Sequence, residues 1–219
     1  MFKKFIFLFS IFFLYCKGKE EALNTNIFPE NENFIYVVKT VQGDSLGVLN
    51  VSIKKEKNFI NFKQDLPNSE VKMDLKTLKP VSSILRIFLP QGPVEISSEF
   101  KKGEILLKAQ FPGGVKDTIL KTKENFYHSD FLLMIPRALP FESGKIYNVK
   151  SFVPLRAQIF DVKINIVGLE EVSFKDSKFR GYHVIFDFGV EKHDAYYEEK
   201  SPHRLLYYTN GRNSIALKI

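Results

Sequence analysis

The chain has 219 residues, 44% of them hydrophobic and 14% aromatic, with no tryptophan and one cysteine, Cys16. The formal charge is +7, but the basic residues are interspersed with acids. We therefore interpret the basic segments as solvated hairpin ends rather than as a nucleic-acid-binding patch. One cysteine excludes an intramolecular disulfide, so stability must come from a hydrophobic core.

The first fifteen residues predict an export signal. Lys3 and Lys4 precede an apolar run over residues 5–15, which is the layout of a signal peptide. As a helix this run would be roughly 16 Å long at ~1.5 Å per residue, about half of the ~30 Å core of a bilayer. We therefore expect residues 1–15 to be a signal peptide rather than a transmembrane helix.

Cys16 is predicted to be a lipid attachment site. Phe13 and Leu14 are acceptable in a lipobox, whereas Tyr15 stands where Gly, Ala or Ser is usual, so the site is a relaxed one. The alternative is an incidental thiol in an uncleaved leader. A lone cysteine is awkward in an exported protein because thiols there oxidise or pair, and acylation removes that difficulty. Cleavage before Cys16 takes away two lysines and no acid, which lowers the formal charge to +5.

The predicted location is the bacterial cell envelope. A diacylglyceryl group on Cys16 would anchor the chain in a membrane, with residues 16–33 as a flexible tether. Lys17 is not the Asp that retains some lipoproteins at the inner membrane, so the analogy favours the outer membrane, at its periplasmic face or at the cell surface. The expected partner is therefore the membrane, through its lipid anchor, and not nucleic acid.

Alternation of apolar and polar residues predicts strands throughout residues 34–219. Asn210-Gly211 is a strong signal for a hairpin turn. We predict a single all-β domain with one short helix, built as a curved antiparallel meander that forms a barrel or half-barrel, because a flat sheet would leave exposed edges. The expected strands cover residues 34–38, 47–53, 58–65, 71–75, 82–89, 94–101, 104–111, 115–120, 146–153, 158–167, 182–191, 195–199, 204–208 and 214–218.

One apolar segment interrupts the strands and predicts the short helix. Ser129 or Asp130 can cap it, and Pro136 and Pro140 prevent a long one. Two interpretations stay open: the helix plugs the concave face of the sheet, or it is a lid over an apolar cavity. The candidate lid residues are Phe131, Leu132, Leu133, Met134 and Ile135.

No pattern of catalytic or metal-binding residues stands out. His183, His193 and His203 lie on or beside neighbouring predicted strands, but no His-x-His or Cys-x-x-Cys pair offers adjacent ligands. Ser129 and Ser201 each have a histidine nearby in sequence, without a Gly-x-Ser-x-Gly elbow. The carboxylate pairs 170–171 and 198–199 are consecutive, so on a strand they point to opposite faces. We expect no metal, no cofactor and no enzymatic activity.

Four segments, in this order along residues 34–219, resemble the bacterial exported proteins grouped as domain of unknown function 3108. They are Asp74-Leu75-Lys76-Thr77-Leu78-Lys79-Pro80, the segment from Asp130 through Arg137-Ala138-Leu139-Pro140-Phe141 to Gly144, Val167-Gly168-Leu169-Glu170-Glu171-Val172, and Ser201-Pro202-His203-Arg204-Leu205 to Gly211. The resemblance implies an exported, strand-rich curved sheet without assigned chemistry. A looser likeness links such sheets to the half-barrels of lipoprotein-sorting factors, which hold acyl chains, but fold analogy does not establish function.

Three functions follow from these expectations, in order of preference. The first is a non-enzymatic, lipid-anchored binding or carrier module for an apolar ligand or an envelope protein. The second is a structural or surface-interaction lipoprotein with a filled core and no small ligand. An enzyme is the third.

Overall fold

A computed structural model describes residues 22–174 and 177–218. The predicted signal peptide and Cys16 lie outside the described residues, so cleavage and lipidation stay predictions. Within the described residues no helix combines the length and the apolar character needed to cross a membrane.

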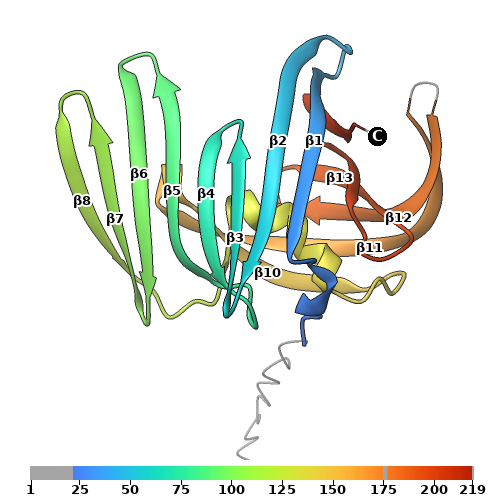
Figure 1. The fold of residues 1–219 in the computed structure, drawn as a ribbon, viewed down its shortest axis with the longest axis horizontal. Helices are drawn as coiled ribbons and strands as arrows, with labels where there is room; N and C mark the ends of the chain where they lie inside the picture. The colour runs from blue at the N-terminus through green and yellow to red at the C-terminus, as the bar shows by residue number, and fades with distance from the viewer. Residues whose placement is uncertain (1–21, 175–176, 219) are drawn as a thin grey trace, which may run out of the picture.

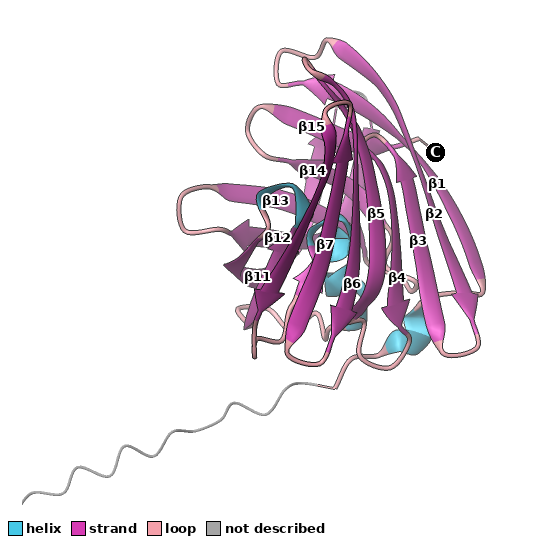
Figure 2. Cartoon of the chain, turned by 90° about the vertical axis from the view of Figure 1, so that its left-hand side faces the viewer, coloured by secondary structure: helices cyan, strands magenta, loops and turns pink. Residues whose placement is uncertain are grey.

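The described residues form one curved sheet of fifteen strands (Figures 1 and 2). The strands of the first half are β1 (Asn31–Thr40), β2 (Ser45–Glu56), β3 (Phe59–Asp65), β4 (Asn68–Asp74), β5 (Pro80–Leu89), β6 (Gly92–Lys101), β7 (Glu104–Phe111) and β8 (Gly114–Lys121). Those of the second half are β9 (Tyr127–His128), β10 (Ile146–Val153), β11 (Gln158–Phe174), β12 (Ser177–Asp187), β13 (Lys192–Glu198), β14 (Leu205–Thr209) and β15 (Asn213–Leu217).

The strand order confirms the predicted curved antiparallel meander. Except for β8 and β9, strands that are consecutive in sequence are neighbours in the sheet. β1 pairs with β15, so the first and last strands of the fold adjoin. Every pairing is antiparallel except that of β9 with β10, which is parallel. The sheet does not close, because β8 and β9 are its two ends. It is therefore a half-barrel rather than a closed barrel.

The two halves of the sheet face each other across a large hydrophobic core. In Figure 1 the strands β1–β8 stand upright, β10–β13 cross behind them, and a helix lies between the two layers. Inward side chains of β1–β4 and β10–β13 make up this core, including Phe62, Met73, Ile164 and Phe186. Burial of these large apolar side chains is the main source of stability in a chain without disulfides.

A second, smaller core brings the two ends of the sheet together. Phe100 of β6 packs edge-on against Phe152 of β10, with ring centroids 5.5 Å apart, and Phe126 lies 5.7 Å from both rings. Leu85, Ile96, Ile105 and Leu107 complete this cluster. Side-chain packing thus joins β5–β7 to β10 where no backbone ladder connects them.

The helix between the layers is a 3₁₀ helix, η2 (Ser129–Ala138), longer than the predicted residues 131–135. The expected cap at Ser129 or Asp130 was wrong, because the cap is His128, whose Nδ1 accepts a hydrogen bond from the Asp130 backbone N–H. Pro136 lies inside the helix and cannot donate to the Leu133 carbonyl three residues earlier. The Tyr197 hydroxyl donates to that carbonyl instead, at 2.8 Å, so the helix continues past the proline.

The fold begins before the predicted domain boundary at residue 34. A short 3₁₀ turn, η1 (Thr25–Ile27), precedes β1, and Phe28 is only 1% exposed in the large core. The Asn24 backbone N–H donates to the Ala138 carbonyl at 2.9 Å. The predicted tether over residues 16–33 is thus too long, because its second half packs against η2 as part of the domain. A further 3₁₀ turn, η3 (Pro154–Arg156), precedes β11.

Candidate functional site

The candidate lid residues lie inside the large core. Phe131 and Ile135 are fully buried, Leu132 and Met134 nearly so, and Leu133 is partly buried. The Phe131 ring lies 5.8 Å from that of Phe28 and 5.5 Å from that of Phe62. None of the five lines the three hollows described below. This is the placement expected for a plug that fills the sheet, whereas movement of the helix as a lid stays a prediction.

Arg137 fixes this helix to the sheet. Its side chain is fully buried, and Nη2 donates to both carboxylate oxygens of Glu32 on β1 at 2.9 Å. Its Nε donates to the Pro202 carbonyl at 3.0 Å, and the guanidinium lies 4.9 Å from the centre of the Phe28 ring. Burial raises the pKa of Glu32, and the Arg137 charge counteracts that rise. Arg137 thus ties η2 to both halves of the sheet, which is a structural role.

The structure gives the three candidate histidines separate partners. His183 stacks on Tyr196, its Nε2 lies 2.7 Å from Asp194 Oδ1, and its Nδ1 lies 3.2 Å from Glu170 Oε2. His193 Nδ1 hydrogen-bonds to the Tyr208 hydroxyl at 2.7 Å, and His203 Nδ1 hydrogen-bonds to the Glu198 carbonyl at 2.9 Å. Within the described residues no group of three or more His, Cys, Asp or Glu side chains is arranged to hold a metal ion.

The Ser129 hydroxyl bonds to a carboxylate rather than to a histidine. The Ser129 hydroxyl donates to Asp130 Oδ1 at 3.3 Å, and Asp130 Oδ2 accepts a hydrogen bond from Ser69 of β4. His128 is buried between the two cores, and burial lowers its pKa while the Asp130 charge opposes that change. Its Nε2 has no hydrogen-bond partner among the described residues. This arrangement holds η2 against β4 and lacks the nucleophile–base contact of a catalytic pair.

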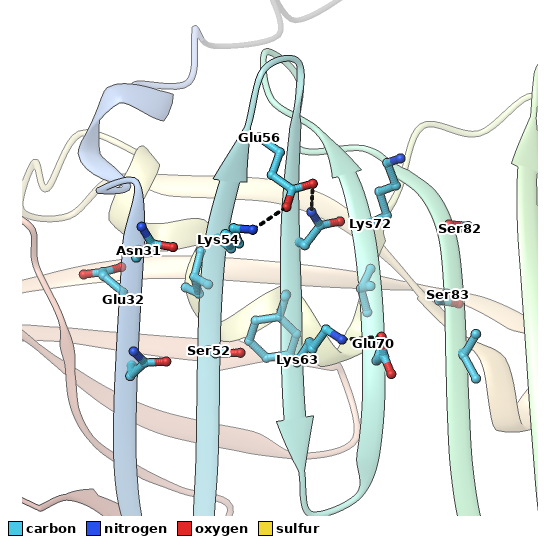
Figure 3. Close-up of a pocket in the computed structure, with 16 residues that line it drawn as sticks. Asn31, Glu32, Ser52, Lys54, Glu56, Lys63, Glu70, Lys72, Ser82 and Ser83 are labelled. Atoms are coloured by element: carbon cyan, nitrogen blue, oxygen red, sulfur yellow. Dashed lines mark hydrogen bonds and ion pairs between the residues drawn. The ribbon is translucent and has the colours of Figure 1, made fainter.

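A polar hollow of about 670 Å³ lies on the outer face of β1–β5 (Figure 3). Strand alternation turns most of these side chains away from the core, whereas Glu32, which pairs with Arg137, and Ser83 face the interior. The register aligns the outward side chains in rows across the sheet. One row runs through Asn31, Lys54, Asn61, Lys72 and Ser82. The other polar residues that line the hollow are Glu32, Asn33, Ser52, Glu56, Lys63, Glu70 and Ser83.

Four of the charges in this polar hollow form two exposed ion pairs. Lys54 Nζ lies 2.8 Å from Glu56 Oε1, and Lys63 Nζ lies 2.8 Å from Glu70 Oε2. Hydrogen bonds from these lysines lower the pKa of Glu56 and of Glu70. Lys72 Nζ lies 4.1 Å from the centre of the Phe59 ring. Exposed pairs of this kind contribute little to stability, about 0.2–1 kcal/mol where they are measured, so they can exchange partners at low cost.

Two smaller hollows lie elsewhere on the sheet. One, of about 610 Å³, lies at the tips of the β5–β6 and β7–β8 hairpins and is lined mainly by Ile87, Phe88, Val94, Phe111, Pro93 and Pro112. The other, of about 410 Å³, adjoins the polar hollow along β1–β4. Sequence reasoning did not single out the residues of any of these hollows. Alternation marks most of them as solvent-facing, but their grouping depends on the register between strands.

Comparisons with known proteins leave the chain without an assigned family. No family profile matches the chain, and no curated protein matches it. A solved structure that is similar to it is a β-barrel-like protein of domain of unknown function DUF1849 from Brucella abortus. The TM-score is 0.49 at 11% identity, over 85% of this chain and 94% of that one. A candidate lipoprotein from Parabacteroides distasonis is similar at a TM-score of 0.32 and 11% identity, over 90% of this chain and 98% of that one.

Proposed function

We propose that the protein is a lipid-anchored envelope protein that binds a partner protein through the polar hollow on β1–β5. The anchor is the predicted diacylglyceryl group on Cys16, supported by the leader layout of Lys3, Lys4 and the apolar run that follows them. The binding role is supported chiefly by one observation, the polar hollow of about 670 Å³ on the outer face.

The chemistry of the hollow suits a protein surface better than an apolar small molecule. Pockets for small ligands are mostly apolar with a few polar groups. Here most of the lining residues carry amide, hydroxyl, ammonium or carboxylate groups, and the Lys54–Glu56 and Lys63–Glu70 ion pairs are exposed. Transient protein interfaces have similar polar, exchangeable contacts. The interior, in contrast, is occupied by η2, with Phe131 fully buried.

Site-specific photo-crosslinking in intact cells tests this function. A photoreactive residue at Asn61, in the middle of the hollow, should give one discrete crosslinked product, and one at the exposed Leu155 of η3 should not. Reversal of charge by Lys54→Glu and Lys63→Glu together should reduce that product at least about fivefold, because opposite charges across an interface turn into like charges. Lys101→Glu, outside the hollow, is the matched control and should leave it unchanged.

The result that would contradict the proposal is equal crosslinking from Asn61 and Leu155, or no product from Asn61. Lipid that co-purifies non-covalently with the mature chain would instead favour the carrier function, with η2 as a lid.

A further inference from the structure

We propose that the free edge strand β8 pairs with β8 of a second copy of this chain, in an antiparallel register centred on Ile119. The two copies would share one continuous sheet. This surface is separate from the polar hollow on β1–β5.

β8 is a long and unprotected edge. It ends the sheet at the left rim of Figure 1, and no described strand lies beyond it. Its eight residues pair with β7 without a bulge, and no proline interrupts them. The opposite end of the sheet, β9, has only two residues. Proteins normally cover, shorten or distort such an edge, because its free N–H and C=O groups recruit another strand.

The free backbone groups belong to the odd-numbered residues of β8. The Thr122 N–H donates to the Gly103 carbonyl at 2.9 Å, which makes this a hydrogen-bonded pair of the β7–β8 ladder. Such pairs alternate along an antiparallel ladder, so the even-numbered residues of β8 direct their N–H and C=O groups at β7. The groups of Val115, Asp117, Ile119 and Lys121 therefore point away from the sheet.

The side chains of these same residues lie on the outer face. Leu120 packs into the small core, so alternation places its odd-numbered neighbours on the opposite side. Val115 and Ile119 are 53% and 62% exposed there. Neither Asp117 nor Lys121 forms an ion pair with another described residue, although Lys108 is the neighbour of Asp117 on β7. The edge thus offers two apolar groups and two opposite charges.

Symmetry and charge select one register. A two-fold axis perpendicular to the sheet places the outer faces of the two copies on the same side. Residues paired across the interface are therefore both odd-numbered or both even-numbered. A register centred on Asp117 would place the two Asp117 carboxylates opposite each other. One centred on Thr118 would place Asp117 opposite Ile119. The register centred on Ile119 places Asp117 opposite Lys121 twice and Ile119 opposite Ile119. Opposite charges directly across a ladder stabilise it, and like charges destabilise it.

A disulfide crosslink tests this register in the full chain. Ile119→Cys should give a disulfide-linked dimer on mild oxidation of membranes, because paired Cα atoms in a hydrogen-bonded position are about 5.5 Å apart and within reach of a disulfide. Val115→Cys, on the same strand and face, is the control. In this register its two copies lie about 26 Å apart along the strands, so it should not crosslink. The wild-type chain, whose one cysteine is Cys16, is the second control and should give no crosslink.

Charge exchange tests the predicted pairs. Asp117→Lys or Lys121→Asp alone should lower the yield of the Ile119→Cys crosslink about fivefold, and the two together should restore it, because each pair is then opposite in charge again. Absence of the Ile119→Cys crosslink, or an equal crosslink from Val115→Cys, would overturn the proposal. Single charge reversals that leave the yield of the Ile119→Cys crosslink unchanged would also overturn it. Crosslinks from Ile119→Cys only to other proteins would identify a different occupant of the edge and equally reject the homodimer.

Discussion

A few buried polar side chains hold the parts of this fold in place. Arg137 joins η2 to Glu32 of β1, and the Tyr197 hydroxyl occupies the carbonyl that Pro136 leaves without an N–H donor. His128 caps η2 from a buried position beside Asp130. Each of these groups is costly to bury without a partner. Loss of one partner should therefore destabilise the fold more than loss of an exposed polar group.

Tyr197→Phe should lower the free energy of unfolding by about 1–3 kcal/mol, because the Leu133 carbonyl loses its donor in a buried site. Tyr196→Phe is the matched control: this ring stacks on His183 on the outer face and should change stability by less than about 0.5 kcal/mol. Urea denaturation of both variants measures the difference. Equal effects at the two positions would show that the hydroxyl of Tyr197 does not support the helix.

His128 should make the fold sensitive to mild acid. Burial lowers the pKa of His128 in the folded state below its usual value of 6.5. Below about pH 6.5 the unfolded chain therefore binds a proton that the folded chain does not, and the free energy of unfolding falls by up to about 1.4 kcal/mol per pH unit. Above that pH His128 contributes no pH dependence. In His128→Gln this part of the slope should vanish. If the free energy of unfolding changes with pH in the same way for wild type and variant between pH 7.5 and 5, His128 is not the source of the acid sensitivity.

At the level of elements, the alternation of apolar and polar residues was sufficient to predict most strands, and the apolar segment that interrupts it predicted the short helix. β7, over residues 104–111, coincides with its predicted bounds, since Gly103 and Pro112-Gly113 terminate the pattern on both sides. β9 could not be predicted, because two residues have no periodicity. Its strand character comes from its parallel contact with β10. The start of the domain was also missed, because Phe28 in a polar segment has no pattern around it and is buried only through contacts with η2.

Phe28→Ala tests whether residues 22–30 belong to the domain. Removal of this fully buried ring should lower the free energy of unfolding by about 3–5 kcal/mol, the usual cost of a large cavity. Thr25→Ala, in the neighbouring turn η1, should change it by less than about 0.5 kcal/mol. Thermal or urea unfolding gives both values. A Phe28→Ala variant as stable as wild type would instead support the original prediction that residues 16–33 are a tether.

At the scale of the whole molecule, the sequence predicted the fold class but not the candidate site. The curved meander follows from short connections between amphipathic strands. The polar hollow depends on five strands in a particular register, and the sequence pattern does not specify which rows meet. The filled interior and the polar outer face support the proposed binding at the surface, whereas the lipid anchor on Cys16 stays a prediction.

Mass spectrometry of the protein purified from bacterial membranes tests this account most directly, under native and then denaturing conditions. The account predicts a chain that begins at Cys16 and carries a covalent diacylglyceryl group under both conditions, with no additional lipid bound to the domain in the native spectrum. A chain that begins at Met1, or a mature chain without a covalent lipid, would contradict the membrane anchor. A lipid lost only on denaturation would contradict the filled interior.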